Sequence, residues 1–179
     1  MNPKQKKKKK QQLIDYGNII YKSLKLLAQG LYPYIQEKIR EDYSDNWLET
    51  AKSVLKNQQG LNKRNLEEAL RQDVSLQLKL IDKLWDSVFE NHLSQPIEYK
   101  VRLSKSKVKK LLDIRNDVAH LSPFSKDKTC KALDSIIQLL KAIDAPEAED
   151  VENEKQEVLQ LLSESAQITK SKSKKITTC

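Results

Sequence analysis

The fold of this chain is decided by residues 20–39, which read IYKSLKLLAQGLYPYIQEKI. Apolar residues recur in this stretch at steps of three and four, as they do along one face of an amphipathic α-helix. The positions on this face are Ile20, Leu24, Leu27, Leu31, Ile35 and Ile39. Gly30 and Pro33 interrupt the pattern, so we expect a kink or a break in the helix there.

The same periodicity predicts helices along the rest of the chain. They are expected from Ser44 or Asp45, over about 73–92 and 104–121, from Ser125 as an N-cap, and from Pro146 onward. The inward-facing residues would be Trp47, Ala51, Val54, Leu55, Leu80, Ile81, Leu84, Trp85, Val88, Phe89, Leu133, Ile136, Ile137, Leu140, Ile143, Val151, Val158, Leu161 and Leu162. Residues 57–72 read as a polar connector that is partly helical.

The composition favours an all-α protein. The 179 residues include three glycines, which are too far apart for the glycine-rich loops that bind phosphate. Tight hairpins also need residues with positive φ, so a sheet built from hairpins is not expected. We therefore expect an up-and-down helical bundle of four main helices plus short additional helices.

Cysteine and histidine are too few for a metal centre. Two cysteines and two histidines, Cys130, Cys179, His92 and His120, have no zinc-ligand spacing, and we expect no metal or other cofactor. Few cysteines and no signal peptide favour a cytoplasmic protein, or a nuclear one if the source has a nucleus. No stretch of about 18 apolar residues exists, so no membrane partner is expected.

The formal net charge of +8 is concentrated at the two ends. Residues 1–12 hold six lysines and no acid, and residues 163–179 hold four lysines and one glutamate. We expect a basic disordered tail at 1–12, a helical domain at 13–162 and a Lys/Ser-rich disordered tail at 163–179. A sharper interpretation makes these tails electrostatic tethers for RNA.

The helix predicted over 104–121 has two distinct faces. Leu111, Ile114, Val118 and Leu121 form a core stripe when successive residues are about 100° apart. A second face carries Lys105, Lys109, Asn116 and His120. Between the two faces lie Arg115, Leu112 and Ala119, and the last two suit contact with another helix.

This second face has the chemistry to act on a phosphodiester. Arg115 offers a fixed fork of donors for phosphoryl oxygens, and His120 can move a proton near neutral pH. RNA supplies its own nucleophile, the 2′-OH, so cleavage needs a base, an acid and a cation. One chain supplies one well-placed histidine, and two copies facing each other would supply two. The structural alternative makes Arg115 a flank of the core and His120 a residue favoured at a helix C-terminus.

The stretch Arg115-Asn116-Asp117-Val118-Ala119-His120 resembles the Arg-x(4–6)-His motif of HEPN domains. The helix around 84–89 before it, the segment 124–127 and the helix around 132–134 after it resemble their surroundings. The similarity spans roughly residues 15–162. It is greatest to the branch found in a nuclear messenger-RNA surveillance endonuclease and beside ATPases in prokaryotic defence-type proteins.

The resemblance implies a helical bundle that dimerises through the motif helix, and in many members a metal-independent ribonuclease. It implies that Arg115 binds or polarises the scissile phosphate, that His120 transfers protons and that Asn116 orients the histidine or the phosphate. We expect Lys105, Lys109 and Lys110 to bind RNA. Because the branch often carries a second enzymatic domain, the chain is expected to be an excised domain or a small protein with a separate partner, such as an ATPase or an antitoxin.

Two interpretations follow from these residues. In the first, the chain is a homodimeric endoribonuclease that acts as a toxin or a defence effector. In the second, it is a non-catalytic HEPN module that dimerises or binds RNA within a larger defence or RNA-processing complex. The intact arginine–histidine pair favours the first, and the polar tails suit the second equally well.

Overall fold

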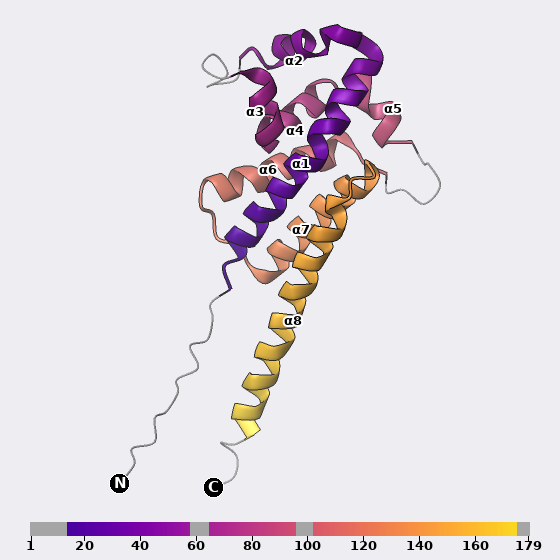
Figure 1. Cartoon of the computed structure of the whole chain (residues 1–179). Coiled ribbons are helices and arrows are strands. Elements are labelled where there is room, and N and C mark those ends of the chain that lie inside the picture. Colours follow the sequence, from indigo (N-terminus) through magenta and orange to yellow (C-terminus); the bar gives the residue numbers. More distant parts are fainter. Residues whose placement is uncertain (1–13, 58–64, 96–101, 175–179) are drawn as a thin grey trace.

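The computed structural model describes residues 14–57, 65–95 and 102–174, and these residues form helices without a β-strand (Figure 1). α1 (Tyr16–Tyr43) packs against α4 (Val74–Lys83), α6 (Lys105–Ala119), α7 (Lys126–Ala142) and α8 (Glu147–Lys174). In Figure 1, α7 and α8 run alongside α1, whereas α6 runs across it. The all-α helical bundle predicted from the sequence is therefore confirmed.

α1 begins at its cap, where the Asp15 carboxylate accepts a hydrogen bond from the Asn18 N–H at 3.0 Å. All six residues of its predicted apolar face are buried. Of the kink or break predicted at Gly30 and Pro33, the break is wrong, because one helix runs through both residues. A Cβ on Gly30 would lie 2.7 Å from Leu140 Cδ2, so this glycine allows α1 to approach α7 closely.

A short 3₁₀ turn, η1 (Ser44–Asn46), joins α1 to α2 (Trp47–Leu55), so the helix predicted from Ser44 or Asp45 is present but its α-helical part begins at Trp47. α2 buries Trp47, Ala51 and Leu55, while Val54 is half-buried. The predicted partly helical connector contains α3 (Leu66–Gln72), and residues 58–64 lie outside the described residues.

The helix predicted over 73–92 is present in three parts. α4 starts after its cap Asp73, whose carboxylate accepts hydrogen bonds from the Ser75 and Leu76 N–H groups. A π-helix, η3 (Trp85–Phe89), and α5 (Glu90–Leu93) follow it. Trp85 and Phe89, four residues apart, both face the core. All six apolar residues predicted on the inner side of this helix are buried.

The helices predicted from 104 and from 125 are confirmed as α6 and α7. The Ser125 hydroxyl caps α7 by accepting a hydrogen bond from the Lys128 N–H at 3.2 Å. α7 buries four of the five predicted stripe residues, and Ile143 at its end is partly buried. The helix that precedes it in the chain, α6, buries Val108, Leu111 and Ile114.

α8 follows Pro146, as predicted, and buries Val151 and Val158. Leu161, which the sequence places on its inner face, is 48% exposed, because the helix has by then extended past the rest of the bundle (Figure 1). α8 continues to Lys174, so residues 163–174 are helical where the sequence predicts a disordered tail. The tail predicted at residues 1–12 lies outside the described residues. None of the described helices has the length and apolar character needed to cross a membrane.

Candidate active site

α6 ends at the histidine of the Arg115–His120 motif. The His120 N–H donates a hydrogen bond to the Asn116 carbonyl oxygen at 2.9 Å, which closes the last turn. Leu121 then adopts a positive φ of 54° and terminates the helix. The Ser122 N–H donates to the Asp117 carbonyl oxygen at 2.9 Å and completes the stop. The backbone of His120 is thus fixed, although its side chain is at the surface.

The motif side chains make few contacts with the rest of the fold. Arg115 Nη1 lies 3.4 Å from Asn116 Oδ1, a long and therefore weak hydrogen bond. Asn116 and His120 are both exposed. No described residue makes a hydrogen bond or an ion pair with the His120 imidazole. Within the chain, the Asn116 side chain makes its hydrogen bond with Arg115 and not with the His120 imidazole.

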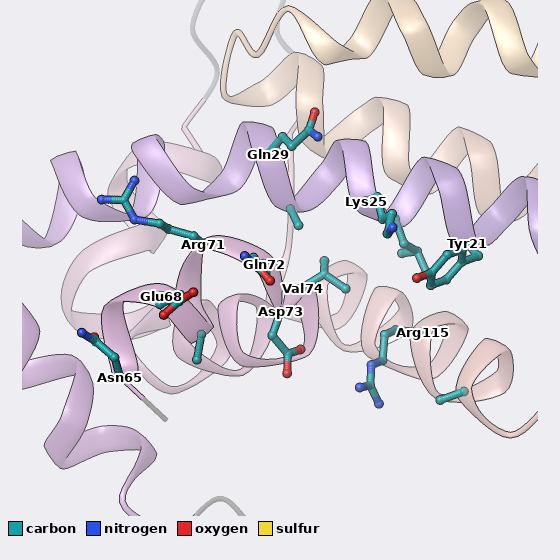
Figure 2. Close-up of a pocket in the computed structure, with 14 residues that line it drawn as sticks. Tyr21, Lys25, Gln29, Asn65, Glu68, Arg71, Gln72, Asp73, Val74 and Arg115 are labelled. Atoms are coloured by element: carbon teal, nitrogen blue, oxygen red, sulfur yellow. The ribbon is translucent and has the colours of Figure 1, made fainter. Parts of the chain in front are cut away.

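Arg115 and Ala119 line one wall of a groove of about 1000 Å³. The opposite wall is α1, with Tyr21, Lys25 and Gln29, and the junction of α3 and α4 closes the groove at one end (Figure 2). His120 is not among the lining residues. Five residues along a helix correspond to a rotation of about 140°, so Arg115 and His120 leave α6 in different directions.

Two of the three lysines predicted to bind RNA contact carboxylates of their own fold. Lys105 Nζ lies 3.2 Å from Asp86 Oδ2 in η3. Lys109 Nζ lies 4.0 Å from Asp82 Oδ1 in α4. Lys110 is exposed and no described residue forms an ion pair with it. The cationic face predicted from the sequence is thus partly neutralised by α4 and η3.

Tyr21 and Lys25 lie in the same groove as Arg115, although the sequence alone gives little reason to connect them with the motif. Tyr21 is 49% exposed, and the Lys25 ammonium lies 5.1 Å from the centre of its ring. The sequence carried one signal, an aromatic residue on the polar side of an amphipathic helix. Only the packing of α1 against α6 brings this signal next to the motif.

At the other end of the groove, Arg71 is fixed in place by its contacts with Tyr32 and Glu67. The Tyr32 hydroxyl and Arg71 Nη2 both donate to Glu67 Oε1 at 3.0 Å, and the guanidinium lies 4.6 Å from the Tyr32 ring centre. Burial, followed by the hydrogen bond to Glu67, raises the pKa of Tyr32. The hydrogen bonds from Tyr32 and Arg71 lower the pKa of Glu67. The charge of Arg71 is therefore already engaged within the fold.

Among the described residues, no group of three or more His, Cys, Asp and Glu side chains could hold a metal ion. Cys130 is a free, half-buried thiol on α7. Neither feature adds a residue to the site at the end of α6.

The chain matches a family profile described as Swt1-like HEPN over residues 22–144. The match includes α2 to α7 with the whole Arg115–His120 motif, and it ends before α8 begins. No curated protein and no solved structure shows significant similarity to the chain. Because the profile covers more than half of its length, the chain belongs to the Swt1-like HEPN family, which confirms the resemblance noted in its sequence.

Proposed function

We propose that this HEPN domain is a metal-independent endoribonuclease that cleaves RNA at a composite site between two copies of the chain. The observation that carries the proposal is the accessibility of the motif side chains at the C-terminal end of α6. There Asn116 and His120 are exposed and Arg115 is half-buried, and no acidic side chain among the described residues pairs with Arg115 or His120. Charged and titratable groups left unpaired in this way remain available to a substrate.

The chemistry is a transesterification within the RNA. A histidine removes the proton of the 2′-OH, and O2′ attacks the adjacent phosphorus. Arg115 stabilises the charge that develops on the phosphoryl oxygens, because its guanidinium presents two parallel donors to them. A second proton donor then protonates the leaving 5′-oxygen as the P–O5′ bond breaks. The products are a 2′,3′-cyclic phosphate and a 5′-hydroxyl end.

The divergence of Arg115 and His120 supports a site made by two chains. Two copies related by a two-fold axis beside α6, so that their motif helices face each other, would place the arginine of one copy near the histidine of the other, and would supply both the base and the acid. The edge of α6 that faces such a partner carries the half-buried Leu112 and the exposed Ala119. Next to the motif, Leu121 adds an apolar side chain that is 90% exposed, although the sequence places it in the core stripe of this helix.

A second candidate function is a non-catalytic module that dimerises or binds RNA within a larger defence or RNA-processing complex. The observation that favours it is the place of His120 at the C-cap of α6, where the helix dipole stabilises a cationic side chain without any catalytic role. The two functions differ in whether RNA is cut.

The test is incubation of the purified full-length chain with RNA and with DNA of the same sequence, both in EDTA. We expect RNA to be cleaved and DNA to remain intact, because DNA lacks the 2′-OH nucleophile. If RNA remains intact at enzyme concentrations that bind it, the non-catalytic module is the better account.

A further inference from the structure

The groove beside Arg115 contains an exposed aromatic ring. Tyr21 lies on α1, whose large aliphatic side chains mostly face the core, and its own side chain is nearly half exposed. Figure 2 shows Tyr21 and Lys25 of α1 at the same end of the groove as Arg115 of α6. Proteins that bind unpaired nucleotides combine exposed aromatic rings with nearby cations, and this end of the groove offers both.

The groove has an apolar floor and a polar rim. Its buried lining residues are Leu24, Ala28, Ala69 and Val74. Below them, Gln77 Nε2 donates to the Ala28 carbonyl oxygen at 2.9 Å and to the Leu70 carbonyl oxygen at 2.6 Å. This one side chain joins α1, α3 and α4, so the floor of the groove is rigid.

The charges divide the groove into two ends. At one end, Lys25 and Arg115 have no carboxylate partner among the described residues. At the other end, Arg71 is paired with Glu67, and Asp73 is committed to capping α4. A phosphate is therefore favoured at the Tyr21 end.

We propose that this end of the groove binds one unpaired nucleotide of single-stranded RNA, with its base stacked on Tyr21 and its phosphate between Lys25 and Arg115. The proposal rests on the proposed function and names the substrate class, an RNA that is unpaired next to the cleavage site. A base in a duplex is stacked on its neighbours on both faces and is not available to a tyrosine ring. The Lys25 ammonium is carried on a flexible aliphatic chain. It can therefore leave the Tyr21 ring and contact a phosphate when a base stacks on the ring.

The primary experiment measures RNA affinity by fluorescence anisotropy, in full-length His120→Ala protein so that the probe is not cut. The probes are a labelled single-stranded RNA 12-mer of mixed sequence and the same strand annealed to its complement. Tyr21→Ala should weaken single-strand binding by on the order of tenfold, since base–aromatic stacking is lost. Tyr21→Phe should bind within about twofold of the parent, because it keeps the ring.

Tyr43 supplies a matched control, since it is another exposed tyrosine of α1 and lies outside the groove. Tyr43→Ala should leave both affinities unchanged, and none of these variants should change duplex affinity. Unaltered single-strand affinity in Tyr21→Ala would overturn the proposal. An equal loss of duplex affinity would also overturn it, as would a parent protein that does not bind the single strand.

A second measurement reports stacking without depending on affinity. Tyr21→Trp places an indole in the groove, while Trp47 and Trp85 are buried and give a constant background. Saturating single-stranded RNA should quench the emission of Tyr21→Trp but not that of Tyr43→Trp. Equal quenching in the two variants would contradict a stacked base at Tyr21.

Failure of this proposal is distinct from failure of the proposed nuclease. If the parent cleaves RNA, and Tyr21→Ala in the active background cleaves and binds like the parent, the nucleotide site is wrong and the nuclease stands. If Tyr21→Ala loses single-strand affinity while the parent cuts no RNA, the nucleotide site stands and the nuclease is wrong.

Discussion

The two halves of α6 use their charges in opposite ways. In the first half, Lys105 and Lys109 reach Asp86 and Asp82 of the preceding helical segment. In the last turns, Arg115 and His120 have no acidic partner among the described residues. Ion pairs on an exposed surface contribute at most about 1 kcal/mol each, so these two pairs add little to the stability of the fold. They do, however, engage two positive charges that would otherwise be free to contact RNA. We therefore place the proposed site at the C-terminal end of the helix rather than along its whole basic face.

The largest effect is expected at His120. Replacing it by alanine should lower the rate of RNA cleavage by about 10²–10⁴, the range typical of one proton-transfer group. Stability should change little, because the imidazole is exposed and makes no hydrogen bond or ion pair with a described residue. The checks are initial cleavage rates and thermal unfolding of both proteins. Cleavage at the parent rate in His120→Ala would place the chemistry elsewhere.

Separating the two copies should affect activity nearly as strongly. Ala119 is exposed on the edge of α6 that would face the partner, so Ala119→Arg should drive the chain to a monomer and remove most cleavage. Because Ala119 also lines the groove beside Arg115, only a loss of both together supports the interface. Sedimentation velocity at micromolar concentration measures the first effect, and a cleavage assay of the same samples measures the second. A parent chain that sediments as a strict monomer and still cuts RNA contradicts a composite site.

Arg115 should affect both cleavage and binding, because its guanidinium contacts phosphate before and during the reaction. Arg115→Ala should lower cleavage by roughly 10² or more, and Arg115→Lys should restore only part of it, since lysine lacks the two-pronged donor. Rates and anisotropy titrations of the two variants provide the measurement. Full activity in Arg115→Lys would show that a point charge suffices.

The smallest effects are expected among the lysines, and they test the comparison itself. Lys110→Ala should lower RNA affinity and reduce the salt slope of binding by about one, as expected for one lost phosphate contact. Lys105→Ala and Lys109→Ala should change the slope less, because each lysine must leave a carboxylate to reach RNA. Titrations at several salt concentrations separate these cases. Larger losses for Lys105 and Lys109 than for Lys110 would reverse the assignment.

The sequence predicts most of the helices and the core because both rest on local periodicity. The buried positions of α1 and the Ser125 cap follow from spacing and residue type alone. The continuity of α1 could not be predicted in this way. In the sequence, Gly30 looks like a residue that breaks the helix. In the fold, a glycine is needed at this position because Leu140 and Ala145 approach it closely.

The site shows the same division. The Arg115–His120 motif was visible in the sequence, and the family match includes it, whereas the roles of its residues stay predictions. A helical wheel places Lys105 and Lys109 on one face but cannot show that a different helix supplies Asp82 and Asp86 to it. In the same way, Tyr21 joins Arg115 in one groove only through the packing of α1 on α6, about ninety residues apart in sequence.

The central claim, RNA cleavage by residues of the chain itself, is tested most directly by the chemistry of the product ends. A defined RNA is incubated with the full-length chain in EDTA, and the fragments are identified by mass spectrometry beside a His120→Ala reaction. The account predicts fragments that end in a 2′,3′-cyclic phosphate and begin with a 5′-hydroxyl, and their loss in His120→Ala. Fragments with 5′-phosphate ends, cleavage that stops in EDTA, or cleavage that persists in His120→Ala would contradict it.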